Sequence, residues 1–245
     1  SLQFLQQGPP MQRNRLLASL SQIDQRKIRV AGTCVPLAFK DVLWTPGGHQ
    51  AHVYFPLEGY VSLLADAGDA HVVEVGMVGP EGMLGLGVAQ GVPVAMVKAL
   101  VQEGGWAWRV DGRAFRAVLA DSVGLRKVLF SYAYVVQAQL SQASACIRFH
   151  EVLPRLARWL LMCQDRSPAN TFPMTQEFLS TMLGVRRVSV TNAASELQAQ
   201  GLIHYHRGIL TVVDRRGLKA VSCLCYARDS SIYEAIFHRP VQGDL

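Results

Sequence analysis

Residues 174–203 constrain the fold more than any other stretch, because two helical apolar patterns flank one glycine there. Apolar residues recur at helical spacing before Gly184 and again after it, which predicts two helices joined by a tight bend. Thr175 suits the start of the first helix, because its hydroxyl can accept a backbone N–H. Gly184 has no Cβ and turns the chain at little steric cost. The stretch therefore predicts a helix-turn-helix.

A short β-hairpin is expected directly after these helices. Two β-rich runs, 202–205 and 209–213, flank the dipeptide Arg207-Gly208, which is typical of a hairpin turn. Between residues 171 and 220, six Lys and Arg stand against three acidic residues. This local positive excess suits contact with phosphates. The hairpin and the charge together predict a winged helix-turn-helix that binds double-stranded DNA.

The side chains expected to reach DNA come from both helices and from the hairpin. The second helix, expected over about 185–199, is the one that would enter the major groove. The residues expected to contact DNA are Thr175, Gln176, Arg186, Arg187, Val188, Ser189, Thr191, Asn192 and Arg207.

The first half of the chain has a different sequence pattern, which is typical of strands rather than helices for most of its length. A short amphipathic helix is expected over 14–29, and from Val30 to Val110 short β-rich runs alternate with Gly and Pro turns. Regularly spaced strands of this kind predict an antiparallel, jelly-roll-like β-roll, and no βαβ rhythm is present. The expected strands are 42–44, 52–55, 60–64, 71–78, 95–102 and 106–110.

A long helix is expected over about 122–148, followed by a shorter one over 153–163. The apolar stripe of the long helix is too extensive to be exposed to solvent on a monomer, so we expect this helix to form a dimer interface. A core helix packed on its own roll remains the alternative, and both can hold on different faces. The stripe consists of Val128, Leu129, Tyr132, Val135, Val136, Leu140, Ala143 and Ile147.

These patterns predict an α+β chain with an N-terminal β-roll, a long dimerisation helix and a C-terminal winged helix-turn-helix. The expected domains are 1–120, the sensor roll with its N-terminal helix; 121–163, the dimerisation helix and the following helix; and 164–245, the DNA-binding domain with a helical tail. The polar stretch 164–170, with Pro168, is the expected hinge.

Composition narrows the classes of protein without naming a function. The 245 residues are half hydrophobic with a net charge of +6, and no apolar run is long enough to span a bilayer. The first residues lack the basic-then-apolar order of a secretory signal, so a cytoplasmic protein is expected. The basic balance is compatible with nucleic acid but does not require it.

The cysteines predict a reducing environment and no disulfide framework. There are five, an odd number, and none forms a C-x-x-C pair. Cys34, Cys146 and Cys163 lie in apolar contexts and are expected in cores. No metal site is expected, although a thiol sensor or metal site stays open at Cys223-Leu224-Cys225, where basic neighbours could lower a thiol pKa.

The order of roll, long helix and winged helix resembles the Crp/Fnr superfamily of bacterial transcription regulators. The most similar motifs are PRLARWLL at 154–161 and TQEFLSTMLGVRRVSVTNAASELQAQGLI at 175–203, supported by VYFPLEGYVSLL at 53–64 and EVGMVGPEGMLG at 74–85. The resemblance implies a homodimer on a two-fold symmetric operator. It also implies contact with RNA polymerase if the protein is an activator.

The resemblance assigns base-reading roles by position. Arg187 falls where the cyclic-AMP receptor has its guanine-reading Arg, and a guanidinium pairs with guanine O6 and N7. Val188 replaces the Glu that accepts from cytosine in that protein, and valine offers only a methyl surface. Asn192 replaces a second Arg and could read adenine or bind phosphate. A different operator from that receptor's is therefore expected.

The same comparison disfavours the family's familiar effectors. Glu81 can match the ribose-binding Glu, but the positions that would hold the cyclic phosphate are Pro93 and Val94, which supply no cation. No cysteine precedes Cys34, which disfavours an N-terminal iron–sulfur cluster. Haem stays open, with His49, His52, His71 and His150 as candidates. No cofactor is predicted, the effector is unknown, and its candidate pocket comprises Glu81, Gly82, Val94, Lys98 and Tyr132.

Two other classes of function remain as alternatives. His49 and His52, followed by Glu58, faintly resemble the metal motif of a cupin-type enzyme, but strand alternation would point the two histidines to opposite faces. A ligand-binding adaptor, whose winged helix contacts protein, is the other alternative. No catalytic order of Ser, His and Asp and no phosphate-binding loop stands out, so the chain is not expected to be an enzyme.

Overall fold

Glycine turns separate the strands of the first half of the chain, as the sequence predicts. We describe the protein from a computed structural model that covers residues 9–68, 71–167 and 169–237. Gly59 shows the constraint most clearly, because its φ is +71° and a Cβ there would lie 2.3 Å from the carbonyl oxygen of Glu103. Only glycine meets both conditions without strain. Residues 1–8, residues 69–70 and Pro168 of the expected hinge lie outside the described residues.

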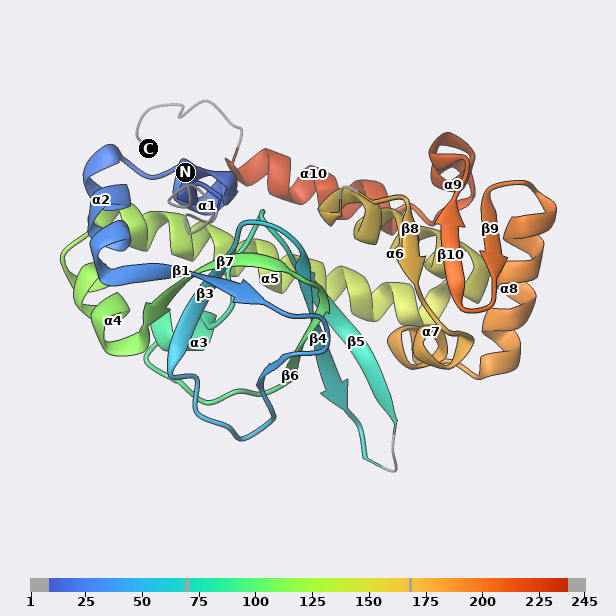
Figure 1. The fold of residues 1–245 in the computed structure, drawn as a ribbon, viewed down its shortest axis with the longest axis horizontal. Coiled ribbons are helices and arrows are strands. Elements are labelled where there is room, and N and C mark those ends of the chain that lie inside the picture. The colour runs from blue at the N-terminus through green and yellow to red at the C-terminus, as the bar shows by residue number, and fades with distance from the viewer. Residues whose placement is uncertain (1–8, 69–70, 168, 238–245) are drawn as a thin grey trace, which may run out of the picture. The chain divides into compact units, whose positions relative to one another are not determined.

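The chain divides into two compact units, 1–63 with 77–136 and 64–76 with 137–245. The first unit combines the strands of the roll with several helices (Figure 1). Its elements are the 3₁₀ helix η2 (Met11–Arg13), α1 (Arg15–Ala18), α2 (Gln22–Ala31), β1 (Gly32–Leu37), β2 (Val42–Trp44), β3 (His52–Pro56), β4 (Tyr60–Asp66), β5 (Val72–Val78), α3 (Leu86–Ala89), β6 (Lys98–Glu103), β7 (Gly105–Asp111), α4 (Gly112–Ala120) and the first part of α5 (Val123–Phe149). The end of β4 and most of β5, within residues 64–76, belong to the second unit.

The strands form two sheets with the orders β1-β7-β3 and β2-β6-β4-β5. β7 pairs antiparallel with both β1 and β3, and β2 pairs antiparallel with β6. Apolar side chains of these strands are fully buried between the elements, including Val53, Phe55 and Val110. Phe55 meets Phe115 of α4 with 6.0 Å between ring centroids, so α4 completes the core. The predicted α+β class with an antiparallel roll is confirmed.

Two local predictions in this unit were incomplete. The expected lead-in helix over 14–29 is two helices: α1 ends at Ala18, and Ser21 starts α2 by accepting the N–H of Asp24 at 3.2 Å. Strand β1 was not among the expected strands. Its sequence, GTCVPL, mixes glycine, proline and polar residues and lacks a clear alternation.

Asn14 fastens the N-terminal helices to the roll. Its side chain is completely buried, and its Oδ1 accepts the N–H of Leu17 at 3.1 Å. Its Nδ2 donates to the carbonyls of Pro56 at 2.9 Å and Gly82 at 2.8 Å. One amide therefore caps α1 and satisfies two buried carbonyls of distant segments, which is how a buried polar group is tolerated.

Part of the apolar stripe of α5 packs within its own chain. Leu129, Tyr132 and Val135 are buried, and the Tyr132 hydroxyl donates to the Met83 carbonyl at 3.2 Å. A different face carries Phe130 and Tyr134, which are 76% and 60% exposed. The core-helix interpretation therefore holds for these three residues of the stripe, whereas Leu140 and Ile147 of the same stripe are 41% and 42% exposed. The face with Phe130 and Tyr134 is a further exposed apolar surface of the helix.

The second unit is mainly helical. The helices of the described residues are too short or too polar to cross a membrane. The domain boundaries expected at residues 121 and 164 remain predictions.

Besides the rest of α5, the second unit contains α6 (Val152–Arg166), β8 (Thr171–Pro173), α7 (Gln176–Leu183), α8 (Arg187–Ala199), β9 (Ile203–His206), β10 (Ile209–Val212), α9 (Arg215–Val221) and α10 (Cys225–Phe237).

Replacing Asn14 with alanine should destabilise the protein. The variant loses a helix cap and leaves the buried carbonyls of Pro56 and Gly82 without their donor, so we expect a loss of about 2 kcal/mol or more in unfolding free energy. Urea unfolding followed by circular dichroism measures the loss. Gln90→Ala, at an exposed position of the same unit, is the control and should change stability by less than about 0.5 kcal/mol. Equal stability of N14A and the wild type would contradict this role.

Candidate nucleic-acid interface

The helix α7 starts and ends as its sequence predicts. Thr175 Oγ1 accepts the backbone N–H of Phe178 at 3.1 Å and so caps the helix. Gly184 ends it with a φ of +62°, and a Cβ at this position would lie 2.9 Å from Val73 Cγ2. The bend therefore requires glycine both for its backbone conformation and for its close approach to the β5 segment.

The helix α8 separates a buried face from an exposed one. Val190, Ala193, Ala194 and Leu197 are buried and repeat at helical spacing. Arg187, Val188 and Asn192 are exposed: Val188 and Asn192 are four positions apart and share one side of the helix, and Arg187 is its first residue. The exposed surface combines a guanidinium, a branched alkyl group and an amide, which are three of the groups that can read base edges.

Two residues expected to contact DNA also bind each other. The Thr191 hydroxyl lies 2.8 Å from Gln176 Oε1, and it lies 3.0 Å from the Arg187 carbonyl of its own helix. This contact joins the first turn of α7 to α8. Gln176 and Thr191 therefore link the two helices, and both are only partly exposed.

The predicted wing is present and has one more strand than expected. β9 and β10 pair antiparallel, and the turn residues Arg207 and Gly208 have φ of +48° and +78°. Positive φ at both turn residues is typical of a type I′ hairpin, whose twist matches that of the strands. The sequence analysis missed β8, which pairs with the other edge of β10 and makes the sheet order β8-β10-β9.

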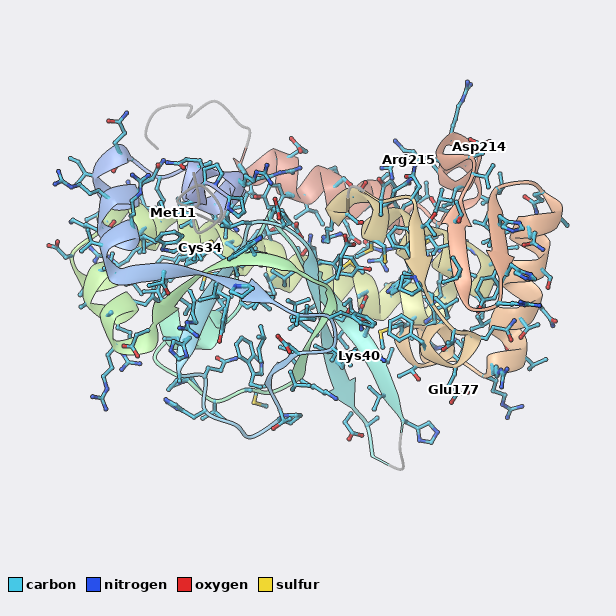
Figure 2. The ribbon with its side chains drawn as sticks, viewed as in Figure 1. Met11, Cys34, Lys40, Glu177, Asp214 and Arg215 are labelled. Atoms are coloured by element: carbon cyan, nitrogen blue, oxygen red, sulfur yellow. The ribbon has the colours of Figure 1, made fainter. Side chains whose placement is uncertain are left out.

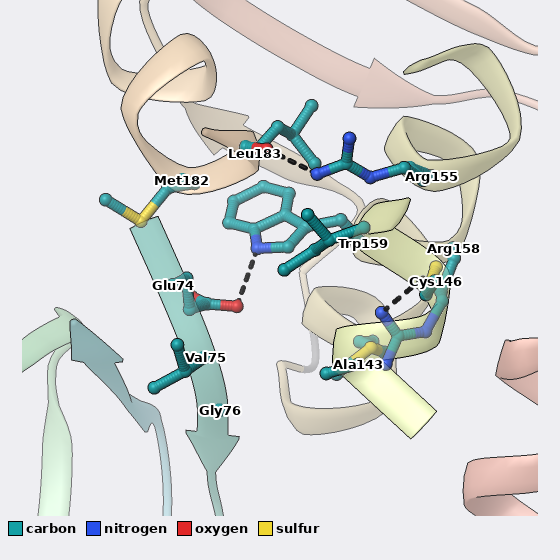
Figure 3. Close-up of a pocket in the computed structure, with 12 residues that line it drawn as sticks. Glu74, Val75, Gly76, Ala143, Cys146, Arg155, Arg158, Trp159, Met182 and Leu183 are labelled. Carbon is teal, nitrogen blue, oxygen red and sulfur yellow. Dashed lines mark hydrogen bonds between the residues drawn. The ribbon is translucent and has the colours of Figure 1, made fainter. Parts of the chain in front are cut away.

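A small cavity of about 50 Å³ lies beneath α7, lined by residues of β5, α5, α6 and α7 (Figure 3). Trp159 Nε1 donates to Glu74 Oε1 at 2.9 Å, and the Trp159 ring meets Phe178 edge-on, with centroids 6.1 Å apart. Arg155 is buried and donates from Nη2 to the Leu183 carbonyl at the end of α7. This bond satisfies one of the carbonyls that a helix end leaves without a partner.

The basic surface is smaller than the sequence count indicates. Arg215, at the start of α9 (Figure 2), donates to Asp165 Oδ1 at 2.5 Å and to Gln164 Oε1 at 2.7 Å. It therefore fastens α9 to the end of α6. Arg186, Arg187 and Arg207 remain exposed on the helix-turn-helix and the wing.

The pKa values of two supporting residues are shifted, each for a clear physical cause. Burial lowers the pKa of Arg155, although a guanidinium stays charged at neutral pH. Burial raises the pKa of Tyr205, and the nearby positive charge of Arg187 partly opposes that shift. The Tyr205 hydroxyl also donates to the Met174 carbonyl at 2.9 Å, which ties the wing to the segment before α7.

The candidate effector residues are only partly brought together. Gly82 and Tyr132 are neighbours, since a Cβ on Gly82 would lie 2.3 Å from the Tyr132 hydroxyl. Glu81 Oε1 accepts the N–H of Gly79 at 3.1 Å within its own turn. Val94 instead forms a β-bridge with His49, and Lys98 starts β6.

The residues of the cupin-like alternative have other partners. Glu58 forms an ion pair with Arg13. His49 takes part in the bridge to Val94, while His52 starts β3 with its ring 6.2 Å from that of Tyr54. These positions give the alternative metal enzyme no support.

Comparison with known proteins agrees with the motif. The sequence model of the Crp-like helix-turn-helix domain matches residues 154–221. A comparison with curated protein sequences found no match. The helix-turn-helix expected from the sequence is therefore confirmed as a Crp-like domain over residues 154–221.

Solved structures of Crp/Fnr-type regulators share the fold at low sequence identity. A transcriptional regulator of the Crp/Fnr family from Eubacterium rectale aligns with a TM-score of 0.68 and 14% identity, over 85% of this chain and 98% of its own. FixK2 from Bradyrhizobium japonicum aligns with a TM-score of 0.66 and 16% identity, over 78% and 98%. A Crp/Fnr-family regulator from Thermus thermophilus aligns with a TM-score of 0.63 and 21% identity, over 78% and 98%.

Replacing Arg155 with methionine should weaken the helix-turn-helix without touching its exposed face. The Leu183 carbonyl loses its donor in a buried setting, so we expect a loss of about 1–3 kcal/mol in unfolding free energy. Chemical denaturation measures it, with Arg216→Met on the exposed side of α9 as the matched control. If R155M is as stable as R216M, the bond to Leu183 contributes nothing to stability.

Proposed function

We propose that this chain, which carries a Crp-like helix-turn-helix domain and has the fold of Crp/Fnr regulators, is a homodimeric, sequence-specific DNA-binding transcription regulator that does not depend on cyclic nucleotides. The observation that carries the proposal is the division of α8 into a buried apolar face and an exposed face with Arg187, Val188 and Asn192. A helix held in this way can enter a major groove with its reading side outward.

The exposed side chains of α8 fit distinct roles in base reading. Arg187 can pair in a bidentate manner with guanine O6 and N7, and Asn192 can pair with adenine N6 and N7 or bind phosphate. Val188 is 61% exposed and offers a methyl surface that suits the thymine methyl group. The operator should therefore differ from one read by an Arg, a Glu and a second Arg.

The remaining expected DNA contacts suit phosphates rather than bases. Arg186 precedes the first residue of α8, and Arg207 lies at the tip of the wing hairpin. Contacts of this kind position a protein on the duplex without reading sequence. The other residues that we assign to this positioning surface are Thr175, Gln176, Ser189 and Thr191.

Dimerisation through α5 is supported by its exposed apolar face. Phe130 and Tyr134 lie one turn apart and are largely exposed, and farther along the helix the exposed residues Ser141 and Ala145 are small. Large side chains beside small ones let two helices interlock. A two-fold dimer would present two α8 helices to a symmetric operator, with half-sites about 34 Å apart.

Independence from cyclic nucleotides is supported by the surroundings of the expected pocket. The Glu81 carboxylate is bonded to its own turn, and Pro93 and Val94 occupy the positions where a cation would meet the cyclic phosphate. A buried phosphate without a cationic partner would be costly. Another effector remains compatible with the roll, and contact with RNA polymerase would follow if the protein is an activator.

Selection from a random duplex pool, with purified protein and no added effector, tests the proposal as a whole. We expect enrichment of an inverted repeat whose half-sites are separated by about one helical turn. Binding that is equal on all sequences would contradict sequence-specific recognition without an effector. Enrichment only after addition of cyclic AMP or cyclic GMP would contradict independence from cyclic nucleotides.

Arg187→Ala should reduce affinity for the selected operator by about 1–3 kcal/mol and relax preference at one base pair of each half-site. The reason is the loss of a bidentate pair with guanine. Fluorescence anisotropy on the operator and on variants of each base pair measures both effects. Arg216→Ala is the control, because Arg216 is an exposed arginine outside α8. If R187A weakens binding equally on every sequence, Arg187 contacts phosphate.

Phe130→Glu and Tyr134→Glu should each weaken the dimer at least about tenfold, because a buried apolar contact is replaced by a desolvated charge. Both side chains are exposed in the single chain, so the monomer should still fold. Sedimentation equilibrium measures the dimer constant, and Val30→Glu, at a position 82% exposed on α2, is the control. An unchanged dimer constant in both variants would place the interface elsewhere.

A further inference from the structure

Four side chains with metal-binding atoms meet in the second unit. They come from segments that precede and follow the helix-turn-helix in the chain. Cys146 and His150 come from the end of α5, and Cys223 and Cys225 come from the segment that leads into α10. Their ligand atoms all lie within 4.8 Å of one another. The three cysteines are buried and the histidine is partly buried.

The spacing of each pair explains why the four groups converge. Cys146 and His150 are separated by one helical turn, so they face the same side at the end of α5. Cys223 and Cys225 flank the exposed Leu224, which is 70% exposed and turns away while its neighbours turn inward. α10 packs on α6, and this packing brings the second pair to the first.

The distances suit a single tetrahedral ion. Cys146 Sγ lies 3.6 Å from Cys223 Sγ, and Cys225 Sγ lies 3.4 Å from His150 Nδ1. A tetrahedral zinc ion with Zn–S of about 2.3 Å and Zn–N of about 2.1 Å places neighbouring ligand atoms about 3.6–3.8 Å apart. The separations are too small for an iron–sulfur cluster, whose own atoms would lie between the ligands.

Two neighbouring groups stabilise negative charge at the sulfurs. Gln142 Nε2 donates to Cys225 Sγ at 3.0 Å. Arg158 Nη1 lies 4.0 Å from Cys146 Sγ (Figure 3), while its Nη2 pairs with Asp229 Oδ2 at 2.5 Å. Three thiolates, one neutral imidazole and a divalent ion carry one net negative charge, and the Arg158 guanidinium beside Cys146 is shared with the Asp229 carboxylate. Hydrogen bonds of this kind orient metal ligands.

We propose that Cys146, His150, Cys223 and Cys225 bind one zinc ion, which joins the end of α5 to the start of α10. Thiolate and imidazole ligands in tetrahedral geometry select zinc among the common divalent ions. Four protein ligands leave no open position, so the ion is structural. The sequence left a metal site open at Cys223 and Cys225 but did not connect Cys146 and His150 with them, because the two pairs are separated by more than seventy residues and neither is a recognised metal motif.

The metal content of the purified full-length chain tests the site. Protein prepared without chelators should contain about one zinc per chain, and Cys225→Ser and His150→Ala should contain little. Cys163→Ser is the matched control, because Cys163 is buried in α6 outside the cluster. Wild-type protein without zinc, or C225S with as much zinc as C163S, would overturn the proposal.

Cobalt(II) is a second probe that needs no variant to fold. Metal-free wild-type protein titrated with Co²⁺ should develop thiolate charge-transfer and tetrahedral ligand-field bands at one equivalent, and Zn²⁺ should displace them. Gln142→Leu keeps all four ligands and should weaken metal affinity about 10–100-fold. Absence of these bands would overturn the site. Iron with acid-labile sulfide, or a Cys146–Cys223 disulfide in the native protein, would also overturn it.

Discussion

The packing of α8 on α6 is the interaction on which the DNA-reading geometry depends. α8 buries two alanines, Ala193 and Ala194, between Val190 and Leu197, so its backbone can approach its neighbour closely. α6 contributes fully buried leucines to this core and also packs on α7, α9 and α10. Because one helix supports all of these elements, a change in the position of α6 would move the whole reading surface as a body.

Local features of the DNA-binding unit could be predicted from the sequence because each depends on neighbouring residues. The Thr175 cap, the Gly184 bend and the Arg207-Gly208 turn all follow from backbone chemistry within a few positions. β8 could not be predicted, since three residues carry too little pattern and the strand exists only because β10 offers an edge.

The features that could not be predicted from the sequence depend on contacts between residues that are far apart in the chain. Glu74 binds Trp159 across eighty-five positions, and Arg155 reaches the end of α7. Neither pairing leaves a periodic signal. The stripe on α5 was visible, but periodicity does not tell which side faces a neighbour, so the exposed Phe130 and Tyr134 became evident only from the fold. The bases that the proposal assigns to Arg187 and Asn192 depend equally on a partner outside the chain.

Cys146 and Cys223 lie 77 positions apart, and α6 to α9, with the helix-turn-helix and the wing, all lie between them. An ion shared by these two ends closes that segment into a loop. In an unfolded chain such closure removes conformational entropy, and the effect grows slowly with the length enclosed. The DNA-binding elements would then gain stability from a constraint on their unfolded state, with no contribution from any residue that faces DNA.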